Sequence, residues 1–150
     1  MALHVRVPDP LRSALPAAGV ADPAGGLVFA ARNGLDGWEA VLAELEEAFI
    51  LTAAAVRDGH PIVYVVHHDD LLGRRGPEGA MVATALLSGA RTVAAETAKA
   101  GIPANVVAVT DATSPATAAA WIAHLLGQGA DGATGEVVRL GPDHIGKALP

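Results

Sequence analysis

The sequence predicts an α/β domain with a mostly parallel sheet of about five strands and helices beside it. Short β-branched apolar runs alternate along the chain with long segments whose apolar residues recur every three or four positions. The composition is 51% apolar but only 3% aromatic, so Ala, Val and Leu are expected to fill most of the core. A chain of 150 residues fits one domain, which removes roughly 70% of its surface from water on folding.

Five segments have the residue pattern of strands. The first alternates apolar and polar side chains, which is typical of a half-buried strand, and a proline follows it at once. Residues 27–31 and 62–66 are continuous apolar runs, as expected for strands that are covered on both faces, and the last two segments are also mostly apolar. The predicted strands are residues 3–7, 27–31, 62–66, 105–109 and 137–140.

Helices are predicted between these strands. Asp9 before Pro10 and Ser114 before Pro115 are typical helix starts, and Gly59 is a natural helix stop. Because strands and helices alternate, the chain is expected to form βαβ units. The predicted helices are residues 10–18, 38–57, 80–100 and 115–126, with a polar loop at residues 67–79.

The charge pattern and residue content argue against several functions. The net charge is −6, and no basic run is longer than Arg74-Arg75, so nucleic acid is not an expected partner. The chain has no cysteine, which excludes disulfides and thiolate chemistry. The longest apolar run, residues 62–66, is far too short to span a bilayer, and no secretion signal is recognisable at the start. We therefore predict a soluble cytoplasmic protein with no membrane partner.

Three stretches of the sequence resemble the short-chain dehydrogenase/reductase family, especially its 3-oxoacyl carrier-protein reductases. They are the strand, loop and helix entry through Trp38 with Phe49-Ile50-Leu51-Thr52, the segment from Arg91 through Glu96 and Gly101-Ile102 to Asn105, and the segment from Ser114-Pro115 to Thr134-Gly135-Glu136. The resemblance covers the C-terminal two thirds of the family's length. It implies a single Rossmann-like domain over 1–150, with a divergent segment 1–25, a family-like core 26–141 and a tail 142–150.

The resemblance also implies that the catalytic groups are missing. The family's Tyr-x-x-x-Lys motif falls on Gly79 and Ala83, and its active-site Asn falls near Glu44. The catalytic Ser falls near Val66, His67 or His68. We therefore expect no catalytic residue and no metal site in this chain.

The family's N-terminal βαβ unit, whose glycine-rich turn binds the dinucleotide pyrophosphate, has no expected counterpart. Gly25 and Gly26 precede a predicted strand, so they cannot form that turn. We therefore expect no cofactor in this chain, and NAD(P)H only in a partner.

A partner subunit is expected from the two long helices. In the resembling family, these helices pair with their equivalents in a neighbouring subunit. The resemblance therefore implies a non-catalytic subunit that assembles with a full-length NAD(P)H-dependent short-chain dehydrogenase, as a heterodimer or heterotetramer, and stabilises or activates it. A homodimeric binding or scaffold protein for an acyl group or a carrier protein is the alternative. The predicted interface residues are Val41, Leu45, Phe49, Thr52, Val56, Val82, Leu86, Gly89, Val93, Thr97, Val138 and Leu140.

The remaining candidate site is a dense cluster of polar residues after the third predicted strand. His67, His68, Asp69 and Asp70 could bind a metal or act as acid and base, since open α/β sheets place sites at this edge. Neighbouring residues on an extended chain point in opposite directions, however, so a solvated loop or a partner contact is favoured.

Three other features receive structural interpretations. Glu44, Glu46 and Glu47 are expected on a solvated helix face. Trp38 and Trp121 are expected to anchor packing. Arg74-Arg75 lies between glycines and could contact an anionic group, such as a phosphopantetheine, or an acidic patch of a partner.

Overall fold

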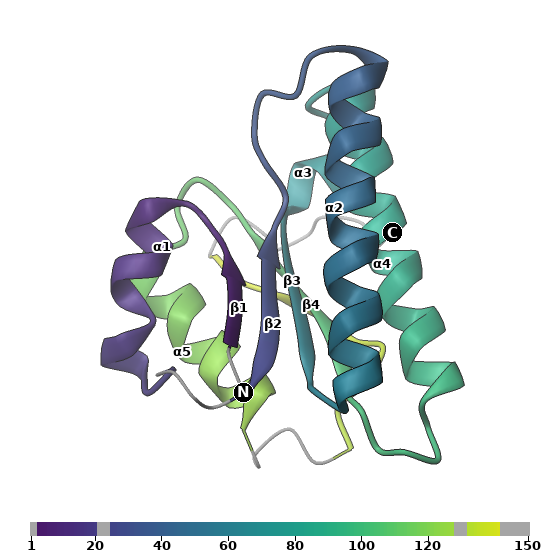
Figure 1. Ribbon diagram of the computed structural model, residues 1–150. Helices are drawn as coiled ribbons and strands as arrows, with labels where there is room; N and C mark the ends of the chain where they lie inside the picture. Colours follow the sequence, from purple (N-terminus) through teal and green to yellow (C-terminus); the bar gives the residue numbers. More distant parts are fainter. Residues whose placement is uncertain (1–2, 21–24, 128–131, 142–150) are drawn as a thin grey trace.

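The protein contains one parallel sheet with its strands in the order β1-β2-β3-β4-β5 (Figure 1). The computed structural model describes residues 3–20, 25–127 and 132–141. The predicted α/β fold is confirmed, and the predicted tail 142–150 lies outside the described residues. The strands are β1 (Leu3–Arg6), β2 (Gly26–Ala30), β3 (Ile62–His67), β4 (Ala104–Val109) and β5 (Val137–Arg139).

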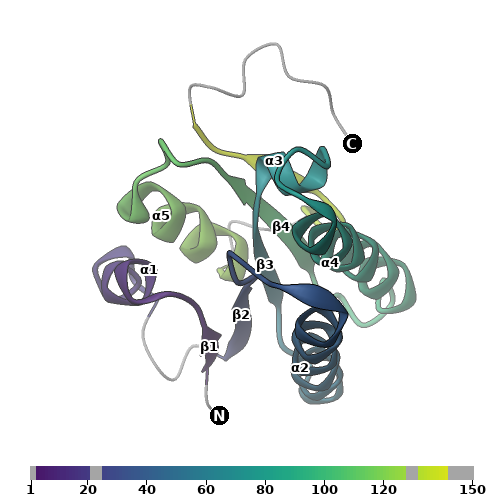
Figure 2. The same cartoon turned by 90° about the horizontal axis from the view of Figure 1, so that it is seen from above.

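The helices form two layers, one on each face of the sheet (Figure 2). The long helices α2 (Gly37–Asp58) and α4 (Pro77–Glu96) cover one face, and α1 (Asp9–Ala14) and α5 (Pro115–Leu126) cover the other. A 3-10 turn, η1 (Pro16–Ala18), follows α1, and the short helix α3 (His68–Leu71) follows β3. None of the helices in the described ranges is long and apolar enough to cross a bilayer.

Each strand supplies side chains to both layers, because successive side chains point to opposite faces. In β2, Leu27 and Phe29 belong to the core under α2 and α4, while Val28 and Ala30 belong to the core under α1 and α5. This explains why the central strands read as continuous apolar runs.

The connections between strands do not all have the same hand. All four advance along the sheet in one direction, yet α1 and α5 lie on the face opposite to α2 and α4. The β1–β2 and β4–β5 connections therefore have the opposite hand to the other two. Connections between parallel strands are almost always right-handed, so one of these two pairs of connections must be left-handed.

Strand β1 forms the edge of the sheet beside β2. The two strands are parallel, with Val5 opposite Val28 and Arg6 opposite Phe29. The guanidinium of Arg12, on α1, donates a hydrogen bond of 3.2 Å to the carbonyl of Val5, on β1. The N-terminal segment thus extends the sheet by one short strand.

The prediction of a loop over residues 67–79 is wrong in two places. Residues 68–71 form α3, which begins where the Asp69 N–H donates to His67 Nδ1, and α4 begins at Pro77. Proline is well suited to the first turn of a helix, so Pro77 was an available start signal. Helix α4 also ends earlier than predicted, at Glu96.

Candidate functional site

A small pocket lies at the carboxyl ends of the central strands, where open α/β sheets place ligands. Its volume is about 160 Å³, and its wall includes Ala31 after β2, His67 at the end of β3 and Val109 at the end of β4. Pro8 and Leu11, from the β1–α1 segment, occupy another side. Drug-sized ligands need pockets of roughly 300–1,000 Å³, so this one is too small for a dinucleotide.

The turn after β1 is poorly suited to phosphate binding. A dinucleotide cradle needs glycines that bring the backbone close and helix N–H groups that face the anion. Here the turn contains Val7 and Pro8, and the first turn of α1 carries the acidic Asp9 and then Pro10, which has no N–H. Both features oppose an approaching phosphate.

Gly79 and Ala83 lie on α4, one turn apart. A Cβ added at Gly79 would come within 2.5 Å of Asp70 Oδ1, so the Asp70 side chain fills the space that a larger residue at this position needs. Ala83 is buried against the core. Neither residue has an ionisable side chain, so neither can donate a proton.

The residues His67, His68, Asp69 and Asp70 do not converge on one point. His67 Nδ1 accepts from the Asp69 N–H, so its Nε2 carries the proton and donates to Asp111 at 3.1 Å. His68 and Asp70 are buried, in contrast to the expected solvated loop. No group of three or more His, Asp or Glu side chains suited to a metal ion occurs in the part of the chain that the structure describes.

Arg74 and Arg75 contact acidic side chains of their own segment. Arg74 lies 3.8 Å from Asp69 and Arg75 lies 3.6 Å from Asp70. Arg75 also donates to Asn33 Oδ1 at 3.0 Å, which ties the loops after β2 and β3 together. These contacts leave less positive charge for an external anion than the sequence suggests.

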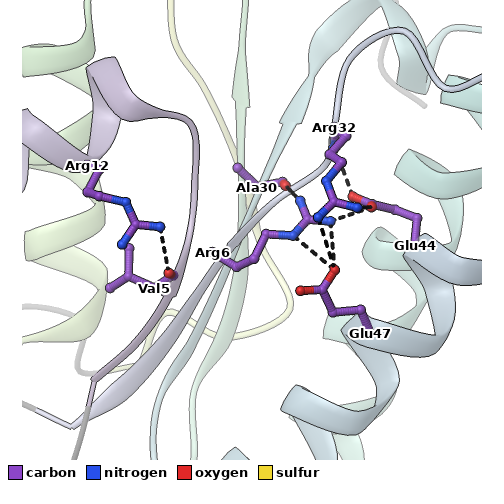
Figure 3. A network of polar contacts seen from close by, with 7 residues as sticks. All are labelled: Val5, Arg6, Arg12, Ala30, Arg32, Glu44 and Glu47. Atoms are coloured by element: carbon purple, nitrogen blue, oxygen red, sulfur yellow. Dashed lines mark hydrogen bonds and ion pairs between the residues drawn. The ribbon is translucent and has the colours of Figure 1, made fainter.

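A buried ion pair joins β1 to α2 (Figure 3). Glu44 is fully buried; its Oε2 accepts from the Arg6 guanidinium, and its Oε1 accepts from the Arg32 backbone N–H at 2.9 Å. Glu47 accepts from Arg6 at 3.2 Å. Arg6 also lies 4.2 Å from the centre of the Phe29 ring.

The pKa of Arg6 reflects these contacts. Burial opposes its protonation, but the hydrogen bonds to Glu44 and Glu47 outweigh burial, and the pKa is raised. Because Glu44 is fully buried, the expectation of a solvated face is wrong for this residue. The signal that the sequence analysis missed is Arg6, a charged side chain at a polar position of the alternating first strand.

Helices α2 and α4 carry all but one of the exposed large apolar side chains of the described residues. Phe49 is 73% exposed and Trp38 is 60% exposed, so Trp38 does not anchor packing as expected. Trp121, on α5, is also exposed and contacts His124 edge to face. We define the outer face by these residues: Trp38, Leu42, Leu45, Phe49, Thr52 and Val56 of α2, and Met81, Ala85, Ser88, Gly89 and Thr92 of α4.

A groove of about 810 Å³ runs between α2 and α4 along the outer face. Leu45, Phe49 and Val56 line one side, and Gly89 lines the other. At the floor, the Tyr64 hydroxyl lies 2.5 Å from Thr52 Oγ1. The groove is therefore mostly apolar, with the Tyr64 and Thr52 hydroxyl groups at its base and with Ser88, Thr92, Arg57 and Glu96 also in its lining.

The predicted interface residues divide between the outer face and the core. The exposed or half-buried ones remain predictions: Leu45, Phe49, Thr52, Val56, Gly89, Val93 and Val138. Leu86 is buried but borders the groove. The other positions are corrected to intramolecular packing, since Val41 and Val82 lie beneath the helices, Leu140 packs under α5, and Thr97 Oγ1 donates to the Val93 carbonyl.

Tyr64 provides a pH-dependent test of this region. Burial raises its pKa, so above pH 10 the unfolded chain loses the phenolic proton more readily than the folded chain. We expect the free energy of unfolding to fall as pH rises above about 10, and to fall less steeply in Tyr64→Phe. Urea unfolding at a series of alkaline pH values measures both slopes. Equal slopes would contradict the assignment.

Comparison with known proteins identifies the fold. No protein-family model matches the sequence, and no curated protein matches it at a significant level. An acetoin dehydrogenase from Enterobacter cloacae matches with a TM-score of 0.66 and 20% identity, over 77% of this chain and 62% of that one. The Cj0485 dehydrogenase matches with a TM-score of 0.70 and 13% identity, over 83% and 66%. The chain shares its fold with these dehydrogenase structures, which supports the short-chain dehydrogenase-like fold expected from the sequence.

A third dehydrogenase structure agrees. The citronellol catabolism dehydrogenase of Pseudomonas aeruginosa PAO1 has a TM-score of 0.61 at 19% identity, over 87% of this chain and 64% of that one. The chain thus spans 62 to 66% of the length of these dehydrogenases. At these sequence identities the likeness establishes the fold alone, and the activities of those proteins are not assigned to this chain.

Proposed function

We propose that this chain is a non-catalytic subunit that assembles with a full-length NAD(P)H-dependent short-chain dehydrogenase and stabilises its active form. The observation that carries the proposal is the outer face of α2 and α4, where Trp38, Leu42 and Phe49 are at least half exposed and Phe49 borders a mostly apolar groove. Apolar patches of this kind on a folded chain mark interaction sites. The proposed partner presents the equivalent two helices, because the two chains would share the short-chain dehydrogenase fold.

The residues at positions 79 and 83 support the non-catalytic part of the proposal. Gly79 and Ala83 stand where the resembling family has Tyr and Lys, and Asp70 occupies the space beside Gly79. The turn after β1 opposes a phosphate through Asp9 and Pro10. Hydride transfer needs both a bound cofactor and a proton relay. These positions offer neither a phosphate-binding turn nor an ionisable side chain. The cofactor of the assembly, NAD(P)H, would bind the partner.

Assembly would act on the partner through burial. A helix pair packed on a helix pair buries on the order of 1,500 Å² in total, an area typical of stable complexes. A chain that binds only the folded partner stabilises it by mass action. The expected result is a partner with a higher thermal midpoint and a larger active fraction.

Co-expression tests the proposal directly. The chain is produced together with a full-length short-chain dehydrogenase encoded in the same genome, first one from a neighbouring reading frame. We expect the two to co-elute, and NADPH oxidation per dehydrogenase subunit to rise when the chain is present. Phe49→Asp should abolish co-elution, since it places a charge in the apolar interface. Trp121→Ala, on the opposite layer, is the matched control and should co-elute normally.

Each failure of this experiment has a clear meaning. Unchanged dehydrogenase kinetics without co-elution for every full-length candidate would overturn the proposed function. Oxidation of NAD(P)H by the isolated chain would overturn its non-catalytic part.

The alternative function is a binding protein for an acyl group. The groove between α2 and α4 has a volume within the range of ligand pockets, and the hydroxyl groups of Tyr64 and Thr52 provide a polar contact at its floor. Native mass spectrometry with acyl thioesters of increasing chain length tests this reading. Retention of one acyl thioester per chain would favour the alternative, and its absence would favour the dehydrogenase partner.

A further inference from the structure

We propose that the small pocket at the carboxyl ends of the central strands binds a short aliphatic carboxylate, with its carboxylate at His67 and its hydrocarbon part against α1 and α5. The inference does not depend on the proposed function, because it concerns the layer of α1 and α5 and not the outer face of α2 and α4. It rests on the size of the pocket, on the hydrogen bonds of its polar side chains and on an exposed carboxylate that already contacts His67.

Most of the pocket wall is apolar. Leu11 of α1 and Ala118 of α5 line it from the helix layer, in which the two helices lie side by side (Figure 2). Ala30 of β2 and Val65 of β3 line it from the sheet. All four residues are buried, so the pocket offers an apolar environment to the body of a ligand.

The pocket volume of about 160 Å³ sets the size of the ligand. An apolar cavity of about 150 Å³ holds benzene, so this pocket fits a hydrocarbon body of about four to six carbons. Part of the wall comes from Pro8, Pro10 and Leu11, which belong to the divergent segment 1–25. The pocket is therefore a feature of this chain and not of its family-like core.

The polar side chains of the wall favour a ligand that accepts hydrogen bonds. The Thr113 hydroxyl donates to a backbone carbonyl, and Ser114 Oγ accepts from a backbone N–H of α5. Asn33 Oδ1 accepts from Arg75 at 3.0 Å, so the amide N–H groups of Asn33 are what it can offer to a ligand. The ligand should therefore carry oxygen acceptors.

His67 provides the donor for the carboxylate of the ligand. Its Nδ1 accepts from the Asp69 N–H, which leaves the proton on Nε2, and Nε2 donates to Asp111 at 3.1 Å. The His67 side chain is 9% exposed, whereas the Asp111 side chain is fully exposed. A contact made by such an exposed carboxylate contributes little stability. The carboxylate of a ligand can therefore replace that of Asp111 at His67.

The charges around the pocket favour a ligand with a single negative charge. Asp9 lies between the two prolines of the wall, and Asp111 lies beside His67. A phosphate monoester carries a charge of about −1.5 to −2 near neutral pH, so these two carboxylates repel it more strongly than they repel a carboxylate.

A bound carboxylate would connect the N-terminal segment to the rest of the sheet. The pocket is lined by the β1–α1 segment, by the ends of β2 and β3, and by the start of α5. A ligand that binds only the folded chain stabilises it by mass action. The ligand would therefore act as a stabilising effector of the fold.

Titration of the natural chain with isovalerate, followed by nuclear magnetic resonance, tests the proposal. We expect one saturable site, with the largest amide shifts at Ala31, His67 and Val109. The dissociation constant should be on the order of 0.1–1 mM, because the ligand has only about seven non-hydrogen atoms. Isovaleramide, which has the same shape without the charge, should bind about tenfold more weakly. Inorganic phosphate should not bind.

Asp111→Ala removes the carboxylate that competes with the ligand. It should tighten isovalerate binding by about twofold to fivefold, and the fold should be unaffected because this side chain is fully exposed. Asp58→Ala is the matched control, since it removes the same charge at the other edge of the sheet, where α2 ends. It should leave the affinity unchanged.

Two further variants test the donor and the pocket. His67→Asn keeps an acceptor for the Asp69 N–H but removes Nε2, and should weaken isovalerate binding by about tenfold. Ala31→Leu fills the pocket and should abolish saturable binding. Ala31 is half-buried, and circular dichroism will check that this variant folds.

Lack of saturable isovalerate binding, or equal affinities for isovalerate and isovaleramide, would overturn the inference. Undiminished binding in both His67→Asn and Ala31→Leu would also overturn it. Phe49→Asp, which tests the proposed function, should bind isovalerate normally because Phe49 lies on the opposite layer. A failure of this inference is therefore distinguishable from a failure of the proposed function.

Discussion

Replacing Arg6 with alanine is expected to lower the free energy of unfolding by about 3–5 kcal/mol, because the variant leaves the fully buried Glu44 carboxylate without its main counter-charge. It also removes the contact with the Phe29 ring and the hydrogen bond of 2.5 Å to the Ala30 carbonyl. Urea unfolding at neutral pH measures the loss. Strand β1 should be the first element to lose hydrogen-exchange protection.

Two control variants isolate the ion pair. Arg12→Ala removes an exposed bond to one backbone carbonyl and should cost less than about 1 kcal/mol. The double variant Arg6→Met with Glu44→Leu replaces both charges by apolar groups and should recover most of the loss, since a buried pair is close to neutral relative to good apolar packing. A single variant Arg6→Ala as stable as the natural chain would show that Glu44 finds another counter-charge.

Placing Tyr and Lys, the residues of the resembling family, at positions 79 and 83 is expected to destabilise the chain without creating a reductase. Gly79→Tyr drives a large side chain into Asp70, which is itself buried and held by Arg75. Ala83→Lys places an amine where Ala83 is 1% exposed. Overpacking alone costs about 1–3 kcal/mol, and burial of the amine adds to it. Thermal unfolding and an NADPH oxidation assay with a ketone substrate measure the two effects.

Two glycine substitutions on the same helix provide the matched comparison. Alanine in place of a helical glycine normally stabilises by up to about 1 kcal/mol. Gly89→Ala should show this gain, because its Cβ has room. Gly79→Ala should instead be destabilising, because its Cβ meets Asp70 Oδ1 at 2.5 Å. Equal effects at the two positions would show that Asp70 moves aside easily.

The strands and the long helices could be predicted because their signals are local. Residues 62–66 form a β-branched apolar run that has no alternative to a buried strand, and β3 lies there. Gly59 ends α2 in the left-handed conformation, which its position after the apolar stripe predicts. Ser114 caps α5 by accepting from the Thr117 N–H, as its place before Pro115 suggests.

The candidate site was less predictable because its contacts join distant segments. Arg6 and Glu44 are far apart in the chain, and nothing in the pattern of α2 distinguishes Glu44 from its exposed neighbour Glu46. The burial of His68 depends on α3, a single turn that is too short to have a periodic signal. Trp38 looked like a core residue by its type, but its place at the first turn of α2 leaves it over solvent.

The sheet edge bears on how molecules of this kind can meet. A bare strand edge invites any passing strand to pair with it, and the result is uncontrolled growth. At one edge of this sheet, strand β1 is four residues long, and the Arg12 side chain donates a hydrogen bond to the Val5 carbonyl. Both features reduce backbone pairing between molecules at the β1 edge, so contacts made through the helices are less prone to continue into strand pairing there.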